Sequence, residues 1–257
     1  MVQVVDEARR AGRRDLLVAS TVLAWIPLVL LAERGAGPVR ELLLGLGTWL
    51  LLLGLLARET PLVRAQTAVV VVFATAIEYT FSPLLEVYVY RFGTVPAFVP
   101  PGHGLVYLAA LSIGRSLWVR QRAKTLVTAT VVVGGAYALW GLSPLAPRLD
   151  VLGAFWFCCL LGFLRWGRSR LLYVGAFFVV TYLELLGTSL GTWAWQAHDP
   201  TGLVAMGNPP SGAAGGYGWF DLAAVTVAPA LLLRLRRPQL LDDGLVQPAV
   251  GGQGAAS

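Results

Sequence analysis

Four ionisable side chains lie within or beside apolar stretches of the sequence. Glu78 and Glu184 each fall well inside an apolar stretch, and His103 and Asp221 lie near the starts of two others. An ionisable group at the centre of a membrane helix costs about 2.5–3.5 kcal/mol on the mildest scale, so each needs a reason. A carboxyl group in an apolar site can stay protonated near neutral pH and donate its proton. We therefore treat these four as candidate catalytic residues for acid–base chemistry.

Each candidate also has a structural interpretation. Glu78 and Glu184 could hydrogen-bond a neighbouring helix, His103 could cap a helix start, and Asp221 could stabilise a helix N-terminus. No apolar stretch carries metal ligands at the i, i+3 or i, i+4 spacing of helical metal sites, and no nucleotide-binding motif is present. We expect neither a metal ion nor a cofactor.

The same plan of a carboxylate followed by a Pro-Pro pair occurs twice. Glu78 precedes Pro100-Pro101 by 22 residues, and Glu184 precedes Pro209-Pro210 by 25. Duplication would give a parallel four-plus-four arrangement of helices, as in some transporters. The alternative is chance, because Pro and Gly are common at helix starts. A tyrosine follows each Pro-Pro pair: Tyr107 in the first copy and Tyr217 in the second.

Two long loops, about 83–101 and 191–216, carry many aromatic side chains. Aromatic rings of this kind anchor a protein at the membrane interface, or they form a lid over an apolar substrate. Both interpretations stay open. The candidate substrate-binding residues in and after these loops are Tyr107, Trp193, Trp195, Asn208 and Tyr217.

The composition indicates which elements position these groups. The chain has 257 residues, of which 56% are hydrophobic and 13% charged, whereas a soluble domain has about 25% charged residues. This favours an all-α polytopic membrane helix bundle, and the scattered basic clusters do not indicate nucleic acid binding. About eight transmembrane helices are predicted, at 15–33, 41–57, 64–82, 102–119, 125–142, 150–165, 171–190 and 217–234.

The distribution of basic residues predicts the orientation of the helices. Fifteen Arg and Lys residues lie in the two termini and alternate connections, against four in the other connections. By the positive-inside rule, both termini are expected in the cytoplasm, with the two long loops on the outer side of a bacterial plasma membrane. We expect a transmembrane domain over 1–237 and a disordered cytoplasmic tail over 238–257.

Two short segments resemble known families. Val99-Pro100-Pro101-Gly102-His103-Gly104, continuing to Ala110, resembles uncharacterised actinobacterial integral membrane proteins, which implies no activity. Glu184-Leu185-Leu186-Gly187, followed by Gly191-Thr192-Trp193-Ala194-Trp195, is similar to a pattern of membrane carotenoid hydratases and related carotenoid-synthesis proteins. That second resemblance implies that Glu184 donates a proton to a polyene double bond.

Three function hypotheses follow. The first is an enzyme that modifies a lipid, isoprenoid or carotenoid by acid–base chemistry at an outer-leaflet-side site. The second is a proton-coupled carrier or flippase, which the paired carboxylates and the repeat would suit. The third is a non-catalytic partner in a membrane assembly. The sequence indicates the lipid bilayer as a partner and gives no oligomeric state.

Overall fold

The structure is a computed structural model that describes the backbone of residues 2–244 and the side chains of residues 11–234. A π-helical turn at Thr80–Leu84 continues the third helix through Pro83. The helices of this part of the chain are α1 Val2–Glu33, α2 Pro38–Leu56, α3 Pro61–Tyr79, α4 Val99–Arg115, α5 Leu117–Gln121, α6 Ala123–Gly141, α7 Val151–Trp166, α8 Arg170–Ser189 and α9 Ala213–Gly244.

Each of the eight predicted segments overlaps one long helix. Among the described residues, six helices are long and apolar enough to cross a membrane: α1, α2, α3, α6, α8 and α9. This supports a multi-pass helical membrane protein. The other two segments correspond to α4 and α7, which have 17 and 16 residues. A membrane crossing by these two shorter helices stays a prediction.

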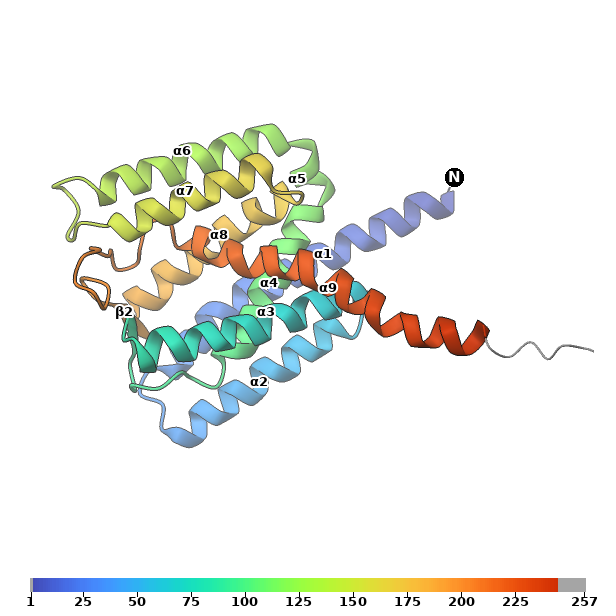
Figure 1. Cartoon of the computed structure of the whole chain (residues 1–257), viewed down its shortest axis with the longest axis horizontal. Helices are drawn as coiled ribbons and strands as arrows, with labels where there is room; N and C mark the ends of the chain where they lie inside the picture. The colour runs from blue at the N-terminus through green and yellow to red at the C-terminus, as the bar shows by residue number, and fades with distance from the viewer. Residues whose placement is uncertain (1, 245–257) are drawn as a thin grey trace, which may run out of the picture.

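The long helices form one bundle with distinct ends. The beginning of α1 and the end of α9 project from the same end, and the connections after α3 and α8 lie at the opposite end (Figure 1). Helix α9 continues to Gly244, past the start of the tail predicted for 238–257. The rest of that predicted tail, 245–257, lies outside the described residues.

Helix α4 is the centre of the bundle and packs against α1, α2, α3 and α8. Two glycines bring its backbone against that of α8. A Cβ atom on Gly114 would lie 2.7 Å from the carbonyl oxygen of Leu171, and one on Gly175 would collide with the carbonyl of Ala110. Small residues at such positions let membrane helices approach closely. The contact fixes α4 beside α8, and with it the relative positions of their side chains.

A buried ionic cluster closes the bundle at the end opposite the long loops. Arg115, the last residue of α4, donates hydrogen bonds to Asp15 of α1 at 2.7 Å and to Glu59 at 2.5 Å. Both carboxylates are almost fully buried. The cluster therefore joins α1, α4 and the α2–α3 connection.

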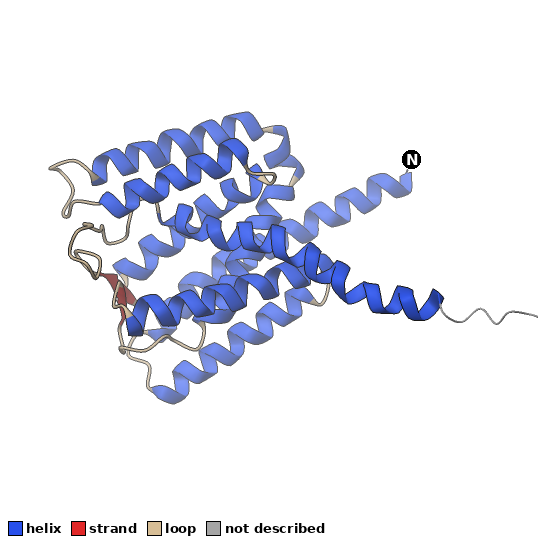
Figure 2. Cartoon of the chain, viewed as in Figure 1, coloured by secondary structure: helices blue, strands red, loops and turns tan. Residues whose placement is uncertain are grey.

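Two short strands interrupt the otherwise helical structure and were not predicted. Strand β1, Tyr88–Tyr90, lies in the first long loop, and strand β2, Trp193–Trp195, lies in the second. They pair antiparallel, with Val89 opposite Ala194 at the centre. Figure 2 shows this ribbon at the loop end of the bundle. The two long loops are therefore joined into one layer over the helices.

Candidate functional site

The strand pair points four aromatic side chains to one side. Side chains alternate along a strand, so the first and third residues of each strand share a face. Tyr88 and Tyr90 are buried, as are Trp193 and Trp195, whereas Ala194 between them is exposed. The polar groups of all four aromatic residues reach carboxylates on the helices below.

Glu78, in the last turn of α3, is held by three polar side chains. The hydroxyls of Tyr88 and Tyr90 donate to its Oε2 at 2.8 and 2.7 Å. His103 Nε2 lies 2.8 Å from its Oε1. All four groups are buried. These contacts fix the Glu78 side chain in position.

Glu184, in the last turns of α8, is held by indole groups. Trp193 Nε1 and Trp195 Nε1 donate to its Oε2 at 3.0 and 3.1 Å. Its Oε1 accepts no hydrogen bond from the described residues. Gly187 makes room for Trp193, because any Cβ at that position would overlap the indole ring. The glycine therefore serves the packing of this indole ring against α8.

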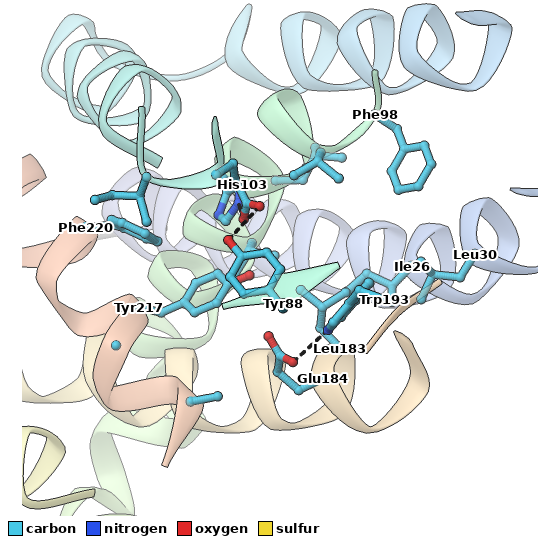
Figure 3. Close-up of a pocket in the computed structure, with 18 of the residues that line it drawn as sticks. Ile26, Leu30, Tyr88, Phe98, His103, Leu183, Glu184, Trp193, Tyr217 and Phe220 are labelled. Atoms are coloured by element: carbon cyan, nitrogen blue, oxygen red, sulfur yellow. Dashed lines mark hydrogen bonds and ion pairs between the residues drawn. The ribbon is translucent and has the colours of Figure 1, made fainter. Parts of the chain in front are cut away.

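A cavity of about 320 Å³ lies between the two carboxylates. Apolar side chains from α1, α3, α4 and α9 form most of its lining, and volumes of this order are typical of small-molecule sites. Figure 3 shows Glu184 and Trp193 on one side and His103 on the other, with Tyr88 and Tyr217 between them. The polar members of the lining are Glu78, Tyr88, Tyr90, His103, Glu184, Trp193, Trp195 and Tyr217, with Thr48, Trp25, Trp156 and Trp219.

Helix α9 packs an aromatic face against the imidazole. The rings of His103 and Tyr217 are stacked, with centroids 5.2 Å apart, and Phe220 contacts the imidazole edge-on at 5.5 Å. His103 Nδ1 is buried and has no hydrogen-bond partner within the described part of the chain. The stacking holds the ring with Nε2 toward Glu78.

Two predicted residues lie deeper in the bundle than the cavity. Tyr107 and Asp221 follow His103 and Tyr217 by four residues each, so they lie on the same helix faces about 6 Å further along. Neither lines the cavity. Both are almost fully buried, and Tyr107 Oη and Asp221 Oδ2 have no hydrogen-bond partner among the described residues. The catalytic role of Asp221 and the substrate-binding role of Tyr107 stay predictions.

Asn208 positions a strand and does not line the cavity. Its Oδ1 accepts a hydrogen bond from the backbone N–H of Trp195 at 2.9 Å. Asp150, at the start of α7, fixes the same loop by accepting from the backbone N–H groups of Gly153, Gly207 and Ser211 at 2.6–2.9 Å. The sequence did not indicate this role of Asp150, because an acidic residue directly before a helix predicts an N-terminal cap and nothing more.

Arg91 connects three parts of the chain beside β1. Its Nη1 lies 3.1 Å from Glu33 Oε2 at the end of α1, and its Nε and Nη2 donate to the carbonyls of Gly191 and Leu190 at 3.1 and 2.5 Å. Glu33 is fully buried. This contact was not predicted either, because its partners are far apart in the sequence.

The two tyrosines of β1 are held in their protonated form. Burial, and next the nearby charge of Glu78, raise the pKa of both Tyr88 and Tyr90 well above the ordinary value. Their hydroxyls therefore remain hydrogen-bond donors to Glu78 at physiological pH. Among the described residues, no three His, Cys, Asp or Glu side chains are grouped as a metal site would require.

The structure brings Glu78, His103 and Glu184 to one cavity, together with Trp193, Trp195 and Tyr217. The strand signal that could have placed the aromatic groups is the alternation Tyr-Val-Tyr and Trp-Ala-Trp in the two loops. His198, the other histidine of the sequence, is exposed in the second loop. No family model, no curated protein and no solved structure matches the chain.

Proposed function

We propose that the protein is an integral membrane enzyme that modifies a lipid or isoprenoid by proton transfer. Glu184 is the acid, and His103 with Glu78 is the base. The observation that carries this proposal is the position of these groups in the wall of a cavity that is otherwise apolar and aromatic. Sites of this kind bind apolar ligands and orient them with a few polar groups.

The hydrogen bonds support a division of roles between the two carboxylates. Within the described part of the chain, Glu184 Oε1 accepts no hydrogen bond, so this atom is available to a ligand. Glu78 has its oxygens occupied by Tyr88, Tyr90 and His103, so it acts through the imidazole.

The reaction that fits these roles starts at a carbon–carbon double bond. The O–H bond of protonated Glu184 breaks as the π electrons form a new C–H bond, which leaves a carbocation and a Glu184 carboxylate. His103 then accepts a proton, either from an adjacent carbon, which shifts the double bond, or from a water molecule that adds to the cation. General acid–base catalysis of this kind contributes about 10²–10⁴-fold to a rate.

For the membrane arrangement, we propose eight crossings with both termini in the cytoplasm of a bacterium, and two repeats, α1–α4 and α6–α9. The antiparallel pairing of β1 with β2 supports the repeat. The helix contacts also support it, with α3 equivalent to α8 and α4 equivalent to α9. Helix α3 packs against α4 as α8 packs against α9, and α3 packs against α9 as α8 packs against α4. The basic residues of the connections support the orientation.

The test compares lipids and pigments of cells by mass spectrometry. Cells with the gene deleted and cells carrying Glu184→Gln should accumulate the same substrate and lack the same product. The matched control is Glu86→Gln, which changes an exposed carboxyl group of the first long loop and should leave the profile unchanged. Identical profiles in the wild type, the deletion strain and the Glu184→Gln strain would contradict the proposal.

A proton-coupled carrier is the second candidate, which the two similar carboxylate-bearing hairpins favour. Purified protein in liposomes would then move an apolar or amphiphilic solute at a rate that depends on the pH gradient. Solute transfer that is the same with and without a pH gradient would contradict this candidate.

A further inference from the structure

The cavity contains carboxylates and no strong cation. Among the described residues that line it, Glu78 and Glu184 are acidic, His103 is the one basic group, and none is Arg or Lys. His103 is already paired with Glu78 at 2.8 Å. A phosphate or carboxylate group of a ligand would therefore meet negative charge here and no partner.

The arginines of the nearby loops are engaged elsewhere. Arg91 contacts Glu33 and the carbonyls at the end of α8. Arg148 donates to the carbonyl oxygen of Trp195 at 2.7 Å. Neither side chain lines the cavity. The protein thus places its guanidinium groups around the site and keeps them out of it.

One carboxylate oxygen is available to a ligand. The two indoles hold Glu184 by Oε2 alone. In Figure 3 the other oxygen points to the side of Tyr217 and Tyr88, and both of these residues line the cavity. Among the described residues, this oxygen is therefore the carboxyl atom of the lining that a positive charge can contact without displacing a protein hydrogen bond.

Aromatic rings surround the same space. The ring centroid of Trp195 lies 4.6 Å from that of Tyr88 and 5.6 Å from that of Trp156. All three rings line the cavity. The faces of aromatic rings attract cations, most strongly where water is excluded. A carboxylate oxygen beside such rings is a site for positive charge on an apolar molecule.

We propose that the cavity selectively binds an apolar molecule that carries a positive charge next to Glu184. This rests on the proposed function, in which the charged molecule is the carbocation formed when Glu184 gives up its proton. An enzyme stabilises its transition state more than its substrate, so a stable cation of the same shape should bind more tightly than the neutral substrate. The substrate itself is then an uncharged isoprenoid or lipid, not a diphosphate ester.

The test uses three probes that share a farnesyl chain. They are farnesyl dimethylamine, which is an ammonium ion at neutral pH, the corresponding hydrocarbon, and farnesyl diphosphate. Binding to the purified full chain in nanodiscs of uncharged lipid is followed by quenching of tryptophan fluorescence, and empty nanodiscs correct for partition into lipid. We expect the ammonium to bind about tenfold more tightly than the hydrocarbon, which corresponds to about 1.4 kcal/mol. The diphosphate should bind no more tightly than the hydrocarbon.

Glu184→Gln should abolish the preference for the ammonium and leave hydrocarbon binding within about twofold of the wild type. Glu86→Gln should retain the preference. The wild-type order of the probes decides the question even if Glu184→Gln fails to fold. Equal binding of ammonium and hydrocarbon, or tightest binding of the diphosphate, would overturn the inference.

The proposed function and this inference can fail separately. A preference for the ammonium with unchanged cellular lipids and pigments in the Glu184→Gln strain would remove the proposed function and keep the binding site. Altered lipids with no preference for the ammonium would keep the enzyme and remove the cation site.

Discussion

The two carboxyl groups of the cavity, Glu78 and Glu184, lie in similar helix and strand arrangements but accept hydrogen bonds from different types of donor. Glu78 and Glu184 each lie near the end of a helix, and each receives two donors from a three-residue strand that follows it. In the α3–α4 half the donors are hydroxyls and the imidazole adds a third. In the α8–α9 half they are indoles, and Tyr217 stacks on His103 without bonding Glu184.

This difference is the basis of the two roles proposed above. Hydroxyl and imidazole groups contact both oxygens of Glu78 and hold its side chain in place. Indole groups satisfy one oxygen of Glu184 and contribute apolar ring surface, which suits a carboxyl group that must exchange a proton with an apolar molecule. Two carboxyl groups in similar positions can take different roles when their hydrogen-bond donors differ.

The largest expected effect distinguishes the carboxylates in activity. Glu184→Gln removes the proton donor and should lower product formation about 100-fold or more. Glu78→Gln acts through His103 and should lower it less. Conversion of substrate in isolated membranes, once the accumulated compound is known, measures both. An equal loss in the two variants would show that the halves do not differ in role.

The contact that joins the halves should contribute strongly to stability. Arg91→Met leaves the fully buried Glu33 carboxylate without its cation and should destabilise the fold by about 3 kcal/mol. Arg148→Met removes a hydrogen bond to one carbonyl of β2 and should cost less. Thermal unfolding in detergent compares the stability of the two variants. Amide hydrogen exchange of β1 and β2 shows whether the strands remain paired. Similar stability of Arg91→Met and the wild type would contradict the assigned role.

A smaller effect is expected from one hydroxyl of the Glu78 half. Tyr90→Phe removes a single buried donor and should destabilise the protein by about 1 kcal/mol. Tyr79→Phe is the control, because Tyr79 lies next to Glu78 in sequence but is 55% exposed. Thermal unfolding of both variants under the same conditions measures the difference, which should vanish if the hydroxyl of Tyr90 does not bond Glu78.

Alkaline pH should weaken the contribution that the two β1 tyrosines make to stability. The pKa of Tyr88 and Tyr90 is raised above the ordinary value of 10.0 by burial and by Glu78. The stability that these tyrosines contribute is fully present below pH 10.0, and it is lost as the pH rises above that value, because the unfolded chain then ionises more readily than the folded one. Unfolding measured across this range should be less steep in pH for the Tyr88→Phe, Tyr90→Phe double variant. If stability falls with pH as steeply in the double variant as in the wild type, the hydroxyls of Tyr88 and Tyr90 are not buried as described.

The sequence predicted helices well and their joining contacts poorly. Apolar length located every long helix, and the ionisable side chains in these stretches included Glu78 and Glu184, which line one cavity. The same argument included Asp221, which lies one helical turn, about 6 Å, beyond Tyr217 and does not line the cavity. The pairing of β1 with β2, and the contact of Arg91 with Glu33, depend on residues far apart along the chain. Local patterns contain no information on such pairs.

The donors of each carboxylate come from its own loop. Tyr88 and Tyr90 follow Glu78 by 10 and 12 residues, and Trp193 and Trp195 follow Glu184 by 9 and 11. The first hairpin can therefore offset the desolvation cost of Glu78 with its own tyrosines as it enters the bilayer, before α8 and α9 have been synthesised. Insertion of this first half need not wait for its contacts with the second half.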